Sequence, residues 1–260
     1  MKIGDGGKSV VMNTKTLKNH LLAMKKFFLV SISFFALTFQ SCVYVNDRDD
    51  VDPRGESTRT YDFKNFDELE MGNAFRVNVL AGPSFSVKAT GELNDLDDLE
   101  MFVQDEKLVA RYRNSWRNRK QMDIDITMPL LEGVDFSGAV DAEIEGFENL
   151  SSVDFELSGA SKCDFDGSAK DFTFDLSGAS QLYLFGTGKY LDGELSGASQ
   201  LNLLDLPAEQ SNLKLSGASS AKVWISRLLE VDASGASSVR YKGDPTIDEK
   251  LSGGSTVRRE

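Results

Sequence analysis

A short internal repeat constrains the fold of this chain more than any other feature. The tripeptide Ser-Gly-Ala occurs six times, a Ser-Gly-Gly follows them, and successive copies lie 18 to 21 residues apart. The copies begin at Ser137, Ser158, Ser177, Ser196, Ser216, Ser234 and Ser252. In all but the first copy a second serine stands three residues after the first: Ser161, Ser180, Ser199, Ser219, Ser237 and Ser255. A unit this short cannot bury an apolar face alone, so the repeat predicts an array of stacked copies.

Apolar and polar residues alternate on both sides of each copy. An apolar residue precedes every first serine: Phe136, Leu157, Leu176, Leu195, Leu215, Ala233 and Leu251. A small or apolar residue also stands five positions after it: Ala142, Cys163, Leu182, Leu201, Ala221, Val239 and Val257. This period of two predicts a strand, a tight bend and a second strand. Glycine gives the bend its backbone freedom, and we expect the alanine to point into a crowded corner.

Stacking of these units predicts an all-β fold, a right-handed parallel β-helix of about seven Ser-Gly-Ala-Ser coils over residues 131–260. Coils about 4.8 Å apart would pair each strand with its equivalents above and below. Serines at equivalent positions would then form hydroxyl ladders along the corner. A β-propeller is the main alternative, but its blades need about 40 residues each. The strict six-residue period of left-handed hexapeptide helices is absent, which favours the right-handed form.

Residues 58–130 lack the Ser-Gly-Ala corner but are also β-rich. Alternating segments occur at 75–80, 85–89, 99–103, 107–112 and 122–128. Only Asn94–Leu99 has a hint of helical periodicity. This part could cap the solenoid, continue it irregularly or form a separate sheet, and the sequence leaves all three open.

Residues 1–41 predict a leader for export. Met24 is followed by Lys25 and Lys26 and then by an apolar run over 27–37. This pattern is typical of a secretory signal peptide at 24–41, because a membrane span needs about 20 apolar residues. The run ends at Ser41-Cys42, which resembles the lipobox of bacterial lipoproteins and implies a lipid on Cys42. A conventional signal peptide with a chance cysteine is the alternative, and residues 42–57 are expected to be a flexible tether.

The charge and the residue counts of the mature chain exclude several functions. Residues 1–41 hold six of the 29 Lys and Arg and one of the 41 Asp and Glu. The remainder carries 23 basic and 40 acidic residues, a net charge of −17, which makes nucleic-acid binding unfavourable. The only histidine, His20, lies in the leader, and the only cysteines are Cys42 and Cys163. We therefore expect no disulfide, no cofactor, no metal site of the Cys/His type and no Ser–His–Asp triad.

One loop stands out against this acidic background. Basic residues and a tryptophan gather in a segment that we interpret as a hairpin loop: Arg111, Arg113, Trp116, Arg117, Arg119 and Lys120. Arginine and tryptophan are common at binding hot spots, so this loop is the candidate ligand-binding site, for an acidic glycan, an anionic headgroup or an acidic protein patch. A solvated turn is the plainer interpretation. Cys163 takes the place of an apolar core residue and is expected to be a buried structural thiol.

Beyond the repeat, the chain resembles the family of the putative auto-transporter adhesin head GIN domain. The resemblance rests on Arg59-Thr-Tyr-Asp-Phe with Phe66-Asp and Leu69, on Phe75-Arg-Val-Asn-Val, and on the Leu-Ser-Gly-Ala-Ser series. It covers about residues 57–256 and implies a β-helical fold and a place in the cell envelope of a Bacteroidetes-type bacterium. No catalytic residues are implied.

These features favour a non-enzymatic outer-membrane lipoprotein, facing the periplasm or the cell surface, that acts as an adhesin-like or interaction scaffold. Its expected partners are the membrane, through the anchor, and a glycan or another envelope protein. A carbohydrate-active β-helix, either a polysaccharide lyase or a glycan binder, is the alternative. In that case acidic residues on neighbouring coils would converge: Asp154, Glu156, Asp164, Asp166, Asp171 and Asp175. The alternation predicts instead that most of them point outward as a solvated face.

Overall fold

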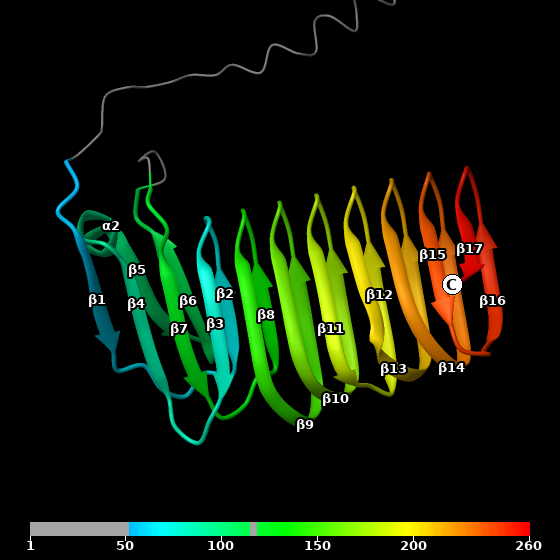
Figure 1. The fold of residues 1–260 in the computed structure, drawn as a ribbon, viewed down its shortest axis with the longest axis horizontal. Helices are drawn as coiled ribbons and strands as arrows, with labels where there is room; N and C mark the ends of the chain where they lie inside the picture. The colour runs from blue at the N-terminus through cyan, green and yellow to red at the C-terminus, as the bar shows by residue number, and fades with distance from the viewer. Residues whose placement is uncertain (1–51, 115–118) are drawn as a thin grey trace, which may run out of the picture. The chain divides into compact units, whose positions relative to one another are not determined.

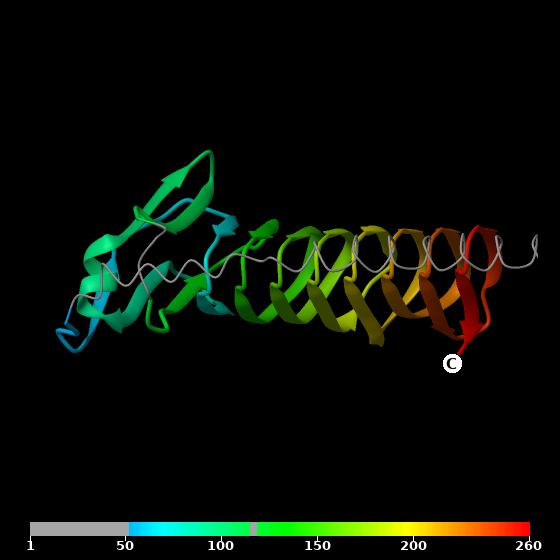
Figure 2. The same ribbon diagram turned by 90° about the horizontal axis from the view of Figure 1, so that it is seen from above.

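The fold was analysed in a computed structural model, which describes residues 52–114 and 119–260, and these described residues form one compact unit. The predicted leader, Cys42 and most of the predicted tether lie outside the described residues. The described part is mostly strand and forms a parallel β-solenoid of about seven turns, as the repeat predicts (Figure 1). Figure 2 shows the coils following one another in a row, with the N-terminal strands at one end.

Each coil has two faces, a Ser-Gly-Ala corner and a bend opposite the corner. Four long strands run through this bend and span both faces: β9 (Asp141–Leu157), β10 (Lys162–Leu176), β13 (Gln200–Leu215) and β14 (Ser220–Ala233). In the other coils the two faces have separate strands: β11 (Gln181–Thr187) and β12 (Tyr190–Leu195), β15 (Ser238–Lys242) and β16 (Thr246–Leu251), and β17 (Thr256–Arg259). In chain order, one face of each coil follows the Ser-Gly-Ala corner, and we call it the departing face. The other face precedes the next corner, and we call it the returning face.

The strands pair in parallel and in register, so equivalent residues of successive coils lie side by side. Cys163 pairs with Ala142 on one side and with Leu182 on the other, and all three side chains are buried. Phe155, Phe165 and Phe172 pack in the core with ring centroids 5.5 to 6.5 Å apart. The apolar positions of the alternating pattern thus form one continuous core along the stack.

The corner is held by a repeated backbone hydrogen bond. From Ala160 to Ala236, the alanine N–H of each corner donates to the glycine carbonyl of the preceding corner; for Ala198 and Gly178 the distance is 2.7 Å. The corner glycines have φ between 68° and 77°, in the left-handed region that other residues rarely adopt. A Cβ on Gly197 would lie 2.5 Å from the carbonyl oxygen of Gly178. Glycine is therefore required both by the conformation and by the close approach of the coils.

Two expectations about the corner are wrong. The alanines are exposed: Ala160, Ala179, Ala198, Ala218 and Ala236. The second serines are the buried residues of the corner: Ser161, Ser180, Ser199, Ser219 and Ser237. Because the left-handed glycine reverses the chain, the alanine lies on the outside of the bend and the next serine returns inward.

The buried serines do not form hydroxyl ladders either. The Ser199 hydroxyl donates to the carbonyl of Ser196 in its own corner at 2.9 Å, and Ser161 and Ser219 make the equivalent bonds at 3.0 and 2.9 Å. A hydroxyl three residues after a carbonyl can reach it within the turn, so this local bond satisfies these buried groups, whereas the buried hydroxyl of Ser180 has no partner.

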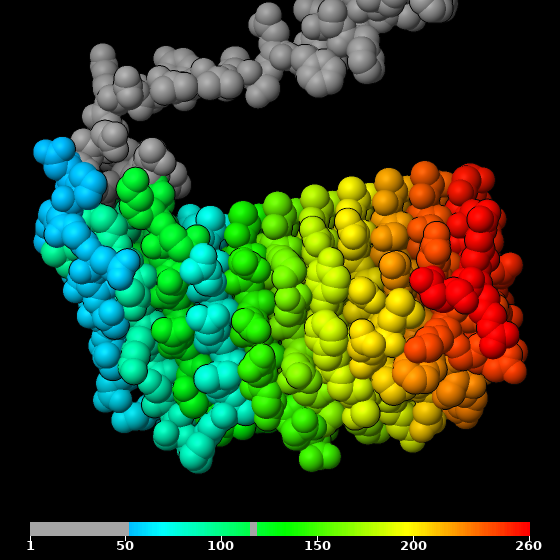
Figure 3. Space-filling model, in the orientation of Figure 1, coloured from blue at the N-terminus to red at the C-terminus, as the bar shows by residue number. Residues whose placement is uncertain are grey.

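The N-terminal part both continues the stack and caps it. Its strands are β1 (Glu56–Tyr61), β2 (Glu68–Met71), β3 (Arg76–Ala81), β4 (Ser86–Glu92), β5 (Leu99–Gln104), β6 (Lys107–Tyr112), β7 (Asp123–Met128) and β8 (Gly133–Phe136). β2 pairs in parallel with both β6 and β8, and β3 pairs in parallel with both β7 and β9. The β2–β3 coil therefore lies between two segments that come later in the chain, which Figures 1 and 3 show as a cyan band between green ones.

The corner of this inserted coil uses asparagine in place of glycine. Asn73 has φ of 67°, and its carbonyl accepts a hydrogen bond from the N–H of Ala139 at 2.6 Å. Asparagine tolerates the left-handed region better than most residues, so Gly72-Asn73-Ala74 is equivalent to the later corners.

Antiparallel strands and one short helix close the N-terminal end. β4 pairs antiparallel with β7, β1 with β4, and β5 with β6. The helix α2 (Leu93–Asp98), close to the predicted position, begins after Glu92, whose side chain accepts hydrogen bonds from the N–H groups of Asn94 and Asp95. Within residues 52–114 and 119–260, no helix has the length and apolar character needed to cross a membrane.

Charged side chains occupy core-facing register positions at the other end. Glu249 of β16 pairs with the buried Val231, and Arg259 of β17 pairs with Tyr241, which packs against the core. Charges at such register positions discourage a further strand from pairing with an open sheet edge. The last coil is thus unsuited to end-to-end stacking.

Gly197→Ala tests the corner. We expect it to lower the free energy of unfolding by about 2–4 kcal/mol, because the left-handed conformation and the short contact with the Gly178 carbonyl both penalise a Cβ. Urea unfolding followed by circular dichroism measures the change. Ala198→Ser, one residue further and exposed, is the matched control and should leave stability unchanged. A loss at Gly197 no larger than that of the control would contradict the required role of glycine.

Candidate functional site

The described ends of the basic segment, 111–114 and 119–120, lie at the corner side of the outermost full coil. The segment joins β6 to β7, and these strands pair with β2 and β3 on different faces of the stack. It is therefore not a hairpin loop, and the expectation of a hairpin is wrong. Trp116 and Arg117 lie outside the described residues.

Arg119 is a structural residue of this corner. Its guanidinium pairs with Asp95 at 3.1 Å and with Asp98, donates to the carbonyl of Asn114, and lies 3.7 Å from the centre of the Tyr112 ring. The side chain is only 15% exposed, and the two carboxylates are still more buried. The N–H donors of the Arg119 guanidinium thus join this corner to α2.

The electrostatics of Asp98 reflect this contact. Burial by itself raises the pKa of Asp98, but hydrogen bonds from Arg119 and Asn114 and the charge of Arg119 outweigh it and hold the pKa below its usual value. The ionised form is therefore the stabilising one.

The other cations of the segment are exposed. Arg111 pairs with Glu100 through Nε at 2.9 Å and lies 5.2 Å from the centre of the Phe102 ring. The Arg113 guanidinium reaches the carbonyl of Asp97 at 3.5 Å, and Lys120 is exposed while its backbone N–H donates to Asp95 at 3.0 Å. The structure thus separates Arg119, which is buried, from Arg111, Arg113 and Lys120, which face solvent.

The acidic residues that a lyase would need are divided between the two faces. Asp164 and Asp166 lie in the departing half of β10, whereas Asp171 and Asp175 lie in its returning half beside Ser152 and Glu156 of β9. They do not converge on one point. Among the residues that the structure describes, no three His, Cys, Asp or Glu side chains are placed to hold one metal ion.

Cys163 is buried in the core between coils, as expected for a structural thiol. Burial raises the pKa of its thiol, which keeps the group protonated and unreactive.

A ladder of carboxylates runs along the returning face. Register pairing brings five of them side by side on successive coils: Glu70, Asp135, Glu156, Asp175 and Glu194. Lys214 ends the ladder with an ion pair to Glu194 at 2.6 Å. Partial burial, and then the negative charges of Asp135, Asp154 and Asp175, raise the pKa of Glu156. The ladder is therefore a line of mutual repulsion, and all of its members except Glu70 stand two residues before the first serine of a copy.

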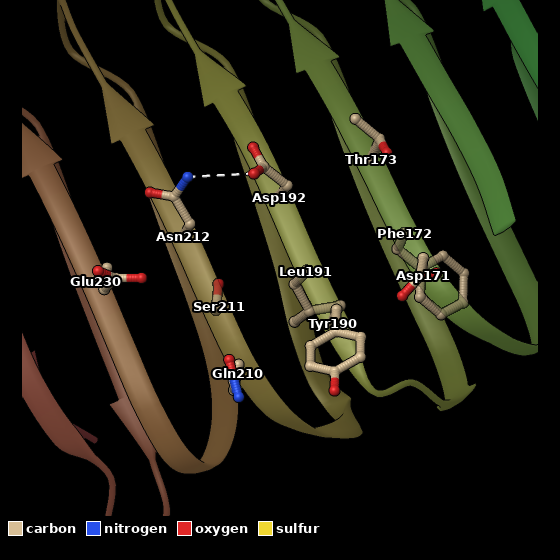
Figure 4. Close-up of a pocket in the computed structure, with 10 residues that line it drawn as sticks. All are labelled: Asp171, Phe172, Thr173, Tyr190, Leu191, Asp192, Gln210, Ser211, Asn212 and Glu230. Atoms are coloured by element: carbon tan, nitrogen blue, oxygen red, sulfur yellow. Dashed lines mark hydrogen bonds between the residues drawn. The ribbon is translucent and has the colours of Figure 1, made fainter.

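A groove lies on the same face, where β10, β12, β13 and β14 pass side by side (Figure 4). Its polar lining includes Asp171, Tyr190, Asp192, Asn212 and Glu230, and Asn212 donates to Asp192 at 3.2 Å. The groove is open and crosses four neighbouring strands, so it suits a ligand that lies across successive coils better than a small enclosed one.

Glu156→Gln tests the carboxylate ladder. We expect it to raise the free energy of unfolding at pH 7 by about 0.5 kcal/mol, because like charges opposite one another in a sheet are unfavourable. The folded-state pKa of Glu156 is raised, so its contribution to stability is greatest below the unfolded pKa of about 4.3 and is lost as pH rises through the folded value. The gain from the substitution should therefore vanish in urea unfolding near pH 4. Glu194→Gln, which loses its Lys214 partner, should give no gain at either pH.

Arg119→Ala tests whether the corner cation is structural. We expect a loss of about 2–4 kcal/mol at pH 7, since two buried carboxylates lose their partner, whereas exposed Arg111→Ala should cost at most about 1 kcal/mol. The folded pKa of Asp98 is depressed, so its stabilising contribution is present above the unfolded pKa of about 3.9 and is lost as pH falls. The difference between the two variants, measured by urea unfolding, should shrink at acid pH. Equal losses at pH 7 would contradict the structural role.

The fold is shared with solved structures of low sequence identity. A "putative adhesin" from Bacteroides fragilis has a TM-score of 0.70 and 23% identity, and the match covers 80% of this chain and 98% of that one. A "putative adhesin" from Parabacteroides merdae has a TM-score of 0.62 and 16% identity, with 79% and 96% covered. A "putative lipid binding protein" from Parabacteroides distasonis has a TM-score of 0.62 and 15% identity, with 81% and 99% covered.

No curated protein matches the chain. Residues 65–245, however, match a family described as "putative auto-transporter adhesin, head GIN domain", and the match includes the inserted β2–β3 coil and the Ser-Gly-Ala corners from Ser137 to Ser234. The chain therefore belongs to the head GIN domain family of adhesin-like proteins.

Proposed function

We propose that this protein is a non-enzymatic, adhesin-like scaffold of the cell envelope, held at the outer membrane by a lipid on Cys42. The observation that carries the proposal is the continuous stack of coils with two long charged faces. Such faces offer ladders of equivalent groups to a polymer or a protein, and the groove described above is open and crosses successive coils. Family membership and the names of the structural neighbours support the same class of function.

The anchor belongs to the proposal as well. The signal-peptide pattern at 24–41 ends directly before Cys42, and a polar segment separates this cysteine from β1 at Glu56. That segment would hold the solenoid away from the membrane surface. A display of this kind suits a protein whose long faces meet partners outside the bilayer.

Cys42→Ala in the full chain tests the anchor and the location together. We expect the wild-type protein to incorporate labelled palmitate and to be cleaved by protease added to intact cells, and we expect both to be lost in the variant. Cys163→Ala is the matched control, because the buried thiol takes a position that Ala142 and Ala221 fill in other coils. The control should retain the label and the cleavage.

Protection of the labelled wild-type protein in intact cells would place it on the periplasmic side and contradict adhesion. Breakdown of a polysaccharide by the purified chain, in a panel of neutral and acidic polymers, would contradict the non-enzymatic role.

A further inference from the structure

Charge is segregated along the departing face. Its N-terminal coils carry an acidic end: Asp125, Asp141, Glu143, Glu145, Asp164 and Asp166. Its C-terminal coils carry a basic end: Lys222, Arg240, Lys242 and Arg258. Three cations lie near the acidic end: Arg76 and Lys162 pair with Asp123 at 3.2 Å and with Asp164 at 2.6 Å, and Lys88 lies opposite Asp125 in register.

The basic end is unfavourable within one molecule. Lys222, Arg240 and Arg258 lie directly opposite one another on three successive coils, where like charges destabilise a sheet. Within the described residues, neither Lys222 nor Arg258 forms an ion pair, and Arg240 reaches only Glu260 at 3.7 Å. The cost of this ladder calls for an acidic partner outside the chain.

Neutral and aromatic side chains separate the two charged ends. Tyr183 of β11 stands beside Asn202 of β13, and Phe185, which is 40% exposed, stands beside the exposed Asp205. Trp224 follows on β14, beneath the ammonium of Lys242 at 4.1 Å. Apart from Asp205 on the central coil, the face therefore changes from acidic through uncharged to basic over seven coils.

This order is self-complementary about Asn202. One row across the face holds, coil by coil, Glu143, Asp164, Tyr183, Asn202, Lys222, Arg240 and Arg258. Let the departing face of a second copy lie on that of the first, with its coils in the opposite order. Glu143 then faces Arg258, Asp164 faces Arg240 and Tyr183 faces Lys222. In the next row Asp166 faces Lys242 and Phe185 faces Trp224, whereas Asp205 lies near the axis and faces the Asp205 of the second copy.

We propose that the departing face is the interface of an antiparallel homodimer, with its two-fold axis at Asn202. Opposite charges meet at both ends, and an aromatic cluster with cation–π contacts lies between them. The returning face lacks this symmetry, since its carboxylate ladder occupies five successive coils. The charges of Glu249 and Arg259 oppose the competing end-to-end association.

The size of the face sets the strength of the contact. Seven coils about 4.8 Å apart and strands of about five residues give roughly 500 Å² per partner. An interface of this size with charged ends is weak and is screened by salt. The proposal goes beyond the adhesin-like function and does not depend on the lipid or on the location of the protein.

The test uses sedimentation velocity of the full chain, purified from cells in mild detergent, with two charge-reversal variants. The acidic-end variant carries Glu143→Lys and Asp166→Lys, and the basic-end variant carries Lys242→Glu and Arg258→Glu. We expect the wild type to dimerise, each variant alone to bind itself at least about tenfold more weakly, and an equimolar mixture of the two to restore dimerisation. Raising NaCl from about 50 to about 500 mM should weaken the wild-type dimer.

The control variant carries Lys214→Glu and Lys250→Glu on the returning face. Its change in charge equals that of the basic-end variant, and it should dimerise like the wild type. Thermal unfolding of every variant establishes that it is folded. A wild type that stays monomeric at low salt, or a mixture that fails to dimerise, would overturn the proposal. Binding of a monomeric wild type to vesicles with anionic lipid, lost in the basic-end variant, would assign the basic end to a polyanion and likewise overturn it.

Discussion

The backbone hydrogen bond between successive corners is the contact on which the rest of the fold depends. It joins the N–H of residues such as Ala198 to the glycine carbonyl one coil earlier, and it requires the left-handed glycine that brings the coils close. Because every corner repeats this bond, register is fixed at one edge of each coil. Parallel pairing along both faces then follows, and the apolar positions meet in one core. Asn73 makes the same bond with another residue type, so the geometry of the corner matters more than the motif that identifies it.

This geometry explains which parts of the fold could be predicted from the sequence. The period of the repeat and the alternation around it predict the solenoid, since one short unit has few ways to bury its apolar side chains. The direction of side chains within the corner could not be inferred in the same way, because Ala198 and Ser199 are both small. The position of the β2–β3 coil between later strands was also beyond the sequence. That arrangement depends on pairing between segments far apart in the chain, and Gly72-Asn73-Ala74 does not match the motif.

The candidate site shows a similar division. Sequence alone identifies a cluster of cations at 111–120, but it cannot show that Arg119 faces Asp95 and Asp98 whereas Arg111 stays at the surface. Those contacts join a corner to a helix that precedes it by about 20 residues. The charges of the departing face are different, since Lys222, Arg240 and Arg258 each stand six residues after the first serine of their copy. Their alignment was available in the repeat, and its meaning emerged only once register pairing placed equivalent residues side by side.

A solenoid separates the residues that specify the fold from those that meet the surroundings. Corner glycines, buried serines and inward apolar residues are nearly uniform from coil to coil, so any outward residue at a given row can vary with little effect on stability. Five successive carboxylates on the returning face and three successive cations on the departing face are nonetheless unfavourable for the isolated chain. Because neither ladder contributes to the core or the corner, both are better explained by what the two faces contact than by folding.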